Sequence, residues 1–104
     1  MNNQNAGLPL NVSQKIIKLM NSVSEIEKAQ VFGSRAKGNF RVGSDIDIAI
    51  HGSGLTQEDR SQILLMYDEL YLPWKLDLIL YDQISEPALK QHIDRIGVTI
   101  FPSP

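Results

Sequence analysis

GSRAKGNFRVGSDID, residues 33–47, is the stretch that decides the fold. Residues 29–32 before it are mostly apolar and predict a short strand that ends at Gly33. Residues 34–44 contain glycine and asparagine with little periodicity, which predicts a loop with one helical turn at its start. From Asp45 to His51, isoleucines alternate with other residues, which predicts a second strand that buries its isoleucine face. The stretch therefore connects two strands through a glycine-rich loop.

The rest of the chain repeats helical and strand patterns on both sides of this stretch. Thr56, with Asp59 three residues later, has the spacing of a capping box at a helix start, and Pro73 stops that helix. Helices are expected over residues 12–23, 56–72 and 87–96, and strands over residues 29–32, 45–51, 75–81 and 98–101. We therefore expect an α+β fold, in which a small mixed sheet is flanked by helices. Residues 1–104 form a single domain in this interpretation, with residues 1–8 flexible.

The composition is that of an ordinary globular domain. Hydrophobic residues make up 42% of the 104 residues and charged ones 21%, which argues against a disordered chain. Ten Lys and Arg against twelve Asp and Glu give a net charge of −2. No general attraction to nucleic acid or to a membrane surface is therefore expected. The longest apolar run, residues 63–67, is far too short to span a membrane.

Cysteine is absent from the sequence, which excludes disulfides, thiolate zinc sites and a cysteine nucleophile. The first eleven residues have neither the basic region nor the apolar region of a signal peptide. Both observations favour the reducing cytoplasm, so we expect a cytoplasmic protein.

Three carboxylates form the first half of a candidate site. Asp45 and Asp47 are two residues apart on one predicted strand, so their side chains leave the same face. Asp77 lies on another predicted strand and points away from its leucine face, so neighbouring strands would bring all three together. Each ionised pair at 4 Å would cost roughly 4 kcal/mol at an effective dielectric near 20. A divalent cation such as Mg²⁺ or Mn²⁺ removes that penalty, since both prefer carboxylate oxygens.

The glycine-rich stretch supplies the second half of this candidate site. A glycine at position 33 lets a phosphate approach the backbone closely, and Ser34 adds a hydroxyl donor. Arg35, Lys37 and Arg41 place positive charge nearby in a chain that is otherwise slightly acidic. Phosphate binding beside a carboxylate metal site is the layout of two-metal phosphoryl transfer.

This double motif resembles the signature of a known enzyme superfamily. Gly33-Ser34, ten residues, and then Asp45-Ile46-Asp47 is similar to the signature of the nucleotidyltransferases that include DNA polymerase beta and kanamycin nucleotidyltransferase. Residues 33–38 most resemble the minimal nucleotidyltransferases, small prokaryotic proteins that are often encoded beside a HEPN-domain partner. Residues 72–78 (LPWKLDL) resemble the third-carboxylate strand of that subgroup, and the likeness covers residues 12–101.

The resemblance implies a mechanism and partners. It implies that Asp45, Asp47 and Asp77 are catalytic and bind two Mg²⁺ or Mn²⁺ ions, and that Asp77 helps to activate an acceptor hydroxyl. The nucleotide-binding residues that it implies are Gly33, Ser34, Arg35 and Lys37. Lys37 departs from the family pattern, in which arginine is commoner, so charge is kept but the guanidinium fork is lost. The implied reaction transfers a nucleoside monophosphate, AMP from ATP, and the implied setting is a toxin–antitoxin pair in which this chain is the antitoxin or the catalytic subunit.

Several alternatives stay open at this stage. The chain could instead be a non-catalytic module that binds nucleotide and neutralises a partner by complex formation. Transfer to a small molecule such as an aminoglycoside is a third reading, which the short length disfavours because 104 residues leave little room for an acceptor domain. A homo-oligomer is also compatible with the sequence. His51 and His92 are expected at the surface, and Trp74 is expected either to pack or to anchor a partner.

Overall fold

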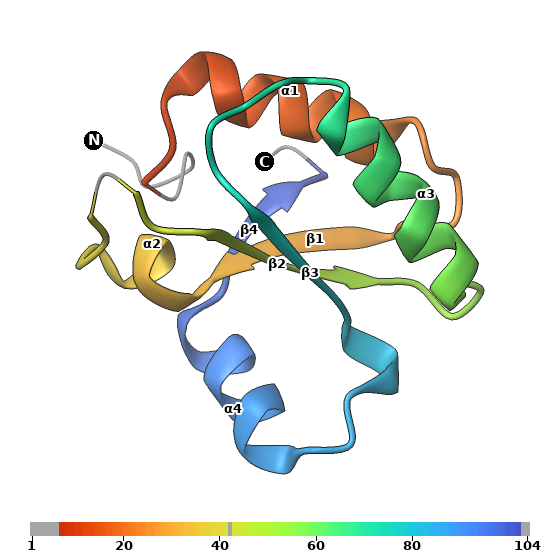
Figure 1. Cartoon of the computed structure of the whole chain (residues 1–104). Helices are drawn as coiled ribbons and strands as arrows, with labels where there is room; N and C mark the ends of the chain where they lie inside the picture. Colours follow the sequence, from red (N-terminus) through yellow and green to blue (C-terminus); the bar gives the residue numbers. More distant parts are fainter. Residues whose placement is uncertain (1–6, 42, 103–104) are drawn as a thin grey trace.

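A four-stranded mixed sheet organises the chain (Figure 1). The structure is a computed structural model that describes residues 7–41 and 43–102. The strands are β1 (Lys28–Phe32), β2 (Ile46–His51), β3 (Leu76–Leu80) and β4 (Val98–Phe101). Their order is β3-β2-β1-β4, in which β1 is antiparallel to β2 and β4, and β2 is parallel to β3. The expected α+β fold with a small mixed sheet is confirmed.

Helices cover both faces of this sheet (Figure 1). The helices are α1 (Leu10–Asn21), α2 (Gly33–Lys37), α3 (Gln57–Asp68) and α4 (Pro87–Ile96), with a 3₁₀ turn η1 (Tyr81–Gln83). The isoleucines of β2 and the leucines of β3 form the main core with α1 and α3. On the opposite face, Phe32, Ala49 and Ile93 form a smaller core under α4. None of the helices in the described part of the chain is long and apolar enough to cross a membrane.

Three helix ends differ from the sequence expectation, and one of them is the end of the first helix, which lies at Asn21 and not at Val23. The first helix begins at Leu10 instead of Val12 because Pro9 starts it and accepts hydrogen bonds from the next turn. Leu10 is exposed, so the apolar period could not indicate it. The helix that Pro73 was expected to stop ends earlier, at Asp68, and is followed by a turn with Tyr71 at φ +52°. The last helix and the last strand have the expected bounds.

The N-terminal segment was expected to be flexible over residues 1–8. Residues 1–6 lie outside the described part of the chain. Leu8 does not fit the expectation, because its side chain is buried in the main core beside α1. The chain is therefore already packed against the domain before its first helix begins.

Helix α3 fixes the position of the edge strand β3. Its N-terminus carries the expected capping box, in which Thr56 Oγ1 accepts from Asp59 N and Asp59 Oδ2 accepts from Thr56 N. Further along, Arg60 Nε donates to Leu78 O at 2.6 Å, and Tyr67 Oη donates to Trp74 O at 2.6 Å. These bonds satisfy carbonyls in and just before β3, so the strand is held at its outer edge as well as by β2.

The capping box of α3 provides a test of the fold. We expect Thr56→Ala to lower the free energy of unfolding by about 1 kcal/mol, because the first turn loses its side-chain acceptor. Urea denaturation followed by circular dichroism measures this change. Thr56→Ser, which keeps the hydroxyl, serves as the control and should retain most of the stability. Equal stability of the alanine variant and the original chain would contradict the assigned role of the cap.

Candidate functional site

Two carboxylates lie side by side at the centre of the candidate site. Asp47 on β2 and Asp77 on β3 are direct register partners in the parallel pair. The next pair toward the strand starts is Ile46 with Leu76, and both of these side chains are buried on the other face. Strand alternation therefore forces Asp47 and Asp77 out on the same face. Asp77 is exposed and Asp47 is partly buried.

The proximity of these groups perturbs Asp47. Its pKa is raised from the ordinary value of 3.8 to about 6, first because burial disfavours the charged form. The negative charges of Asp77 and Asp45 add to this, and so does a side-chain hydrogen bond with Asp77. Near neutral pH the site therefore holds crowded negative charge that a proton or a cation would relieve.

Asp45 completes the acidic group from a position just before β2. It is exposed and precedes Ile46, the first residue of the strand. In the described part of the chain, no three His, Cys, Asp or Glu side chains are arranged so that they could hold a metal ion by themselves. The Asp47 and Asp77 oxygens nevertheless fit a hard divalent cation, because Mg²⁺ usually takes one or two protein carboxylates and completes its shell with water and phosphate. The roles of these residues as metal ligands stay predictions.

Gly33 makes the close approach of Asp47 to the start of α2 possible. Phe32, the last residue of β1, pairs with Asp47 across the antiparallel ladder, so the chain turns into α2 directly beside this carboxylate. A Cβ at position 33 would collide with Asp47 Oδ2. Gly33 also has φ +73°, a left-handed conformation that side chains disfavour. Both constraints require glycine at this position.

The remaining predicted nucleotide-binding residues occupy α2, which is five residues long. Ser34 lies in its first turn and is partly exposed, next to Gly33. Lys37 is exposed at the last position, before Gly38 ends the helix in a left-handed conformation at φ +86°. Gly33, Ser34 and Asp47 are therefore brought together, whereas Lys37 lies at the far end of the helix.

Arg35 does not have the position expected of a nucleotide ligand. Its side chain is buried at 3% exposure, and its guanidinium donates to the backbone carbonyls of Gly7 and Ser44. It also lies against the aromatic rings of Phe40 and Trp74. This geometry gives Arg35 a structural role. The sequence did not indicate these contacts, because no local pattern relates position 35 to positions 7, 44 and 74.

Each of the two histidines contacts an aromatic side chain. His51, at the other end of β2, is partly buried and not fully at the surface as expected. Its ring stacks on Tyr81 at 4.1 Å between centroids, and its Nε2 lies 2.6 Å from Gln30 Oε1. Burial is the main cause of the lowered pKa of His51. His92 lies edge-on to Phe32 in the smaller core region.

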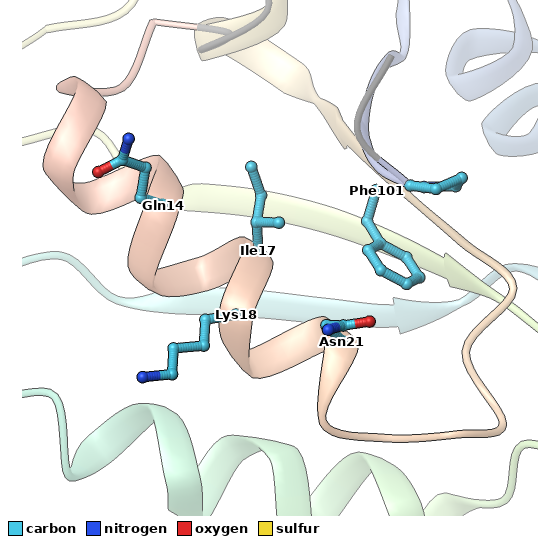
Figure 2. A pocket seen from close by; sticks show the side chains of 6 residues that line it. Gln14, Ile17, Lys18, Asn21 and Phe101 are labelled. Carbon is cyan, nitrogen blue, oxygen red and sulfur yellow. The ribbon is translucent and has the colours of Figure 1, made fainter.

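One groove of the surface is lined by residues away from the carboxylates. A groove of about 510 Å³ lies between α1 and the end of β4. Figure 2 shows Gln14, Ile17, Lys18 and Asn21 along α1 and Phe101 across the groove, with the Lys18 side chain pointing away from Phe101. None of these is a predicted site residue. At the candidate site itself, Asp45 and Asp77 are exposed to solvent.

Comparison with known proteins identifies a family that matches most of the chain. Residues 14–103 match the family described as Polymerase beta, Nucleotidyltransferase. The chain belongs to this nucleotidyltransferase family. The match includes the whole of the Gly33–Asp47 stretch and Asp77, and the family predicted from the sequence is confirmed.

Solved structures with the same fold come from toxin–antitoxin complexes. A toxin–antitoxin with AMP-PNP matches with a TM-score of 0.73 and 24% identity, over 86% of this chain and 72% of the other. The MntA–HepT toxin–antitoxin matches with a TM-score of 0.68 and 21% identity, over 89% and 72%. A complex of tri-AMPylated HEPN toxin with MNT antitoxin from Shewanella oneidensis matches with a TM-score of 0.66 and 22% identity, over 86% and 68%. No curated protein sequence matches the chain.

The raised pKa of Asp47 predicts an unusual dependence of stability on pH. Between pH of about 4 and 6 the folded chain keeps a proton that the unfolded chain has lost, so the free energy of unfolding falls as pH rises through this range. We expect Asp47→Asn to remove this fall, because the amide carries no charge. At pH 8 in metal-free buffer the variant should be more stable by roughly 1 kcal/mol, after allowance for solvent screening.

Chemical denaturation at pH 4 and pH 8 measures this effect. Glu27→Gln is the matched control, because Glu27 is an exposed carboxylate outside the candidate site. If Asp47→Asn and Glu27→Gln change stability equally at both pH values, the raised pKa assigned to Asp47 is wrong.

Proposed function

We propose that this chain transfers a nucleoside monophosphate, AMP from ATP, to a hydroxyl group. The observation that carries the proposal is the Asp47–Asp77 register pair beside the glycine at position 33. Family membership supports the reaction class. The position of these groups on an open part of the sheet suits a large acceptor that approaches from outside.

In this proposal the acidic residues hold divalent cations. Asp45, Asp47 and Asp77 would be the ligands of Mg²⁺ or Mn²⁺, which would neutralise the charge of a bound triphosphate and of the carboxylates themselves. The raised pKa of Asp47 supports the assignment, because burial and the neighbouring carboxylates disfavour its negative charge, which a cation would stabilise.

Gly33 and Ser34 hold the β- and γ-phosphates in the same proposal. The backbone at Gly33 lies so close to Asp47 that a Cβ would collide with its carboxylate. A phosphate bound at the first turn of α2 would therefore be adjacent to the carboxylates. The Ser34 hydroxyl is a donor in that turn. Lys37 is exposed at the last position of α2. In this proposal it contributes positive charge near the phosphates without contacting them directly.

The chemical step forms one P–O bond and breaks another. An acceptor oxygen attacks the α-phosphorus and pyrophosphate leaves with the bonding electrons from the opposite side. The acceptor proton passes to Asp77, which is exposed and therefore reachable. Most of the rate then comes from in-line positioning and from charge stabilisation, as in other phosphoryl transfers.

The acceptor proposed is a hydroxyl side chain of a HEPN-domain protein encoded beside this chain. The support is the fold shared with MNT antitoxins that were crystallised with HEPN toxins, including one complex in which the toxin is AMPylated. A docked protein can place its hydroxyl at about 3–3.5 Å from the α-phosphorus, which an open surface cannot do for a free small molecule. This chain would then be the antitoxin of the pair.

Nucleotide binding should depend on the cation. We expect removal of Mg²⁺ with EDTA to weaken ATP binding by at least about tenfold, because the carboxylates then face the triphosphate without a bridging charge. Isothermal titration with and without Mg²⁺ measures the difference. Asp47→Asn should reduce the difference in ATP affinity between the two buffers, while Glu27→Gln should leave that difference unchanged. Equal ATP affinity in both buffers would argue against metal-assisted binding.

Transfer to the partner is measured by intact-mass spectrometry. We expect the mixture of both proteins with ATP and Mg²⁺ to add one or more AMP masses to the partner, and we expect Asp45→Asn to abolish the addition. The non-catalytic alternative predicts a tight complex that suppresses the partner without any mass change, equally well with Asp45→Asn. That second result would overturn the proposed transfer.

A further inference from the structure

The Arg35 guanidinium joins three parts of the chain that are distant in sequence. Its Nη1 donates to Gly7 O at 2.7 Å, and its Nη2 donates to Ser44 O at 3.1 Å, with Nε at 3.4 Å from the same oxygen. Ser44 directly precedes Asp45. One side chain of α2 thus holds both the N-terminal segment and the residue before the first carboxylate.

The same guanidinium reaches the strand that carries the other carboxylate. Its central carbon lies 5.3 Å from the centroid of the Trp74 ring and 4.8 Å from that of Phe40. Trp74 is three residues before Asp77, and its carbonyl is held by Tyr67 Oη. Arg35 therefore contacts the segments that lead into β2 and into β3, one on each side of the candidate site.

The packing around this side chain leaves little freedom. A Cβ at Gly7 would lie 2.6 Å from Phe40 Cε1 and 3.0 Å from the Arg35 carbonyl oxygen. The Ser44 hydroxyl accepts from Arg41 N at 2.8 Å, which closes the loop that follows Phe40. Gly7, Arg35, Phe40, Ser44 and Trp74 are called the Arg35 cluster below; Arg35 is its buried centre, and Phe40 and Gly7 lie at its exposed edge.

Burial of a guanidinium costs free energy unless new contacts replace the water around it. Burial is the main cause of the lowered pKa of Arg35, which reflects the loss of water around the cation. Two carbonyl oxygens and two aromatic faces replace that water. Only the planar fork of arginine reaches both carbonyls while it stacks on rings, so lysine cannot replace it.

We propose that Arg35 is a positioning residue that sets the relative placement of Asp45 and Asp47 against Asp77, and that it is not a ligand of the nucleotide. The cluster ties the start of β2 to the start of β3 at the edge where the carboxylates meet. The effect of Arg35 on catalysis rests on the proposed nucleotidyl transfer. The effect of Arg35 on the geometry of the free chain does not depend on that proposal.

The test uses Arg35→Lys, which keeps the charge but cannot donate to Gly7 and Ser44 together. Amide hydrogen exchange in the free chain should rise over residues 44–47 and 74–77. Trp74 is the only tryptophan of the sequence, so its fluorescence reports directly on the loss of the guanidinium from its ring. With partner, ATP and Mg²⁺, kcat should fall by about ten- to a hundredfold, because a displacement near 1 Å has that effect. The affinity for ATP should stay nearly unchanged.

Arg60→Lys is the matched control, since Arg60 also donates to a backbone carbonyl but contacts α3 and β3 outside the cluster. It should leave exchange over residues 44–47 and Trp74 emission as they are. Phe40→Leu gives a second variant if Arg35→Lys does not fold, because it removes one ring and keeps both carbonyl contacts. It should change the same readouts in the same direction, to a smaller extent.

The outcomes separate the two hypotheses. Weaker ATP binding by Arg35→Lys, with exchange and Trp74 emission of the free chain unchanged, would make Arg35 a nucleotide ligand and overturn the proposal. Identical effects of Arg60→Lys would also overturn it, since general loss of stability would explain both. If the unmodified chain transfers no nucleotide, the proposed function fails, while exchange and fluorescence still decide whether Arg35 positions the carboxylates.

Discussion

The structure depends on the parallel register of β2 and β3. In that register Ile46, Ile48 and Ile50 lie beside Leu76, Leu78 and Leu80, and all six side chains are buried against α1 and α3. A slip of one residue would turn either strand over and expose its apolar face. The same alternation leaves Asp47 next to Asp77 on the opposite face. The hydrophobic core therefore determines where the carboxylates meet, although neither carboxylate takes part in it.

Magnitudes explain why the chain tolerates this charge crowding. Burial of one Ile or Leu side chain contributes about 1.5–3 kcal/mol, and six such side chains enforce the register. Repulsion between two carboxylates is roughly 4 kcal/mol at 4 Å in a medium of dielectric near 20. The core exceeds the repulsion, so the carboxylates stay together, and burial together with the neighbouring charges raises the pKa of Asp47. A functional site of this kind needs a stable core on the other face of the sheet.

The sequence predicted those parts of the fold that short-range periodicity encodes. Alternation indicated the faces of Asp47 and Asp77, the Thr56–Asp59 spacing indicated the capping box, and the helix over residues 87–96 had its expected bounds. The contacts of Arg35 could not be predicted in this way. Its partner Gly7 is 28 positions away and Trp74 is 39 positions away, and periodicity carries no information about such contacts. A basic residue next to a glycine and a serine suggests a phosphate ligand, whereas the Arg35 side chain donates hydrogen bonds to the backbone of Gly7 and Ser44.

The second face of the sheet is divided along the length of its strands. At the start of β2 and β3, Asp47 lies partly buried beside the start of α2, and its register partner Asp77 is exposed. In the middle, Ala49 and Ile79 pack under α4 through Ile93. At the far end, the side chains of His51 and Tyr81 stack, and Tyr81 Oη donates to Asp94 of α4. Helix α4 also reaches the end of the sheet that carries Asp47, because Phe32, the register partner of Asp47, belongs to the smaller core and lies against His92 of α4. One sheet face therefore buries a small core next to an ionisable group, and burial is the first cause of the raised pKa of that group, Asp47.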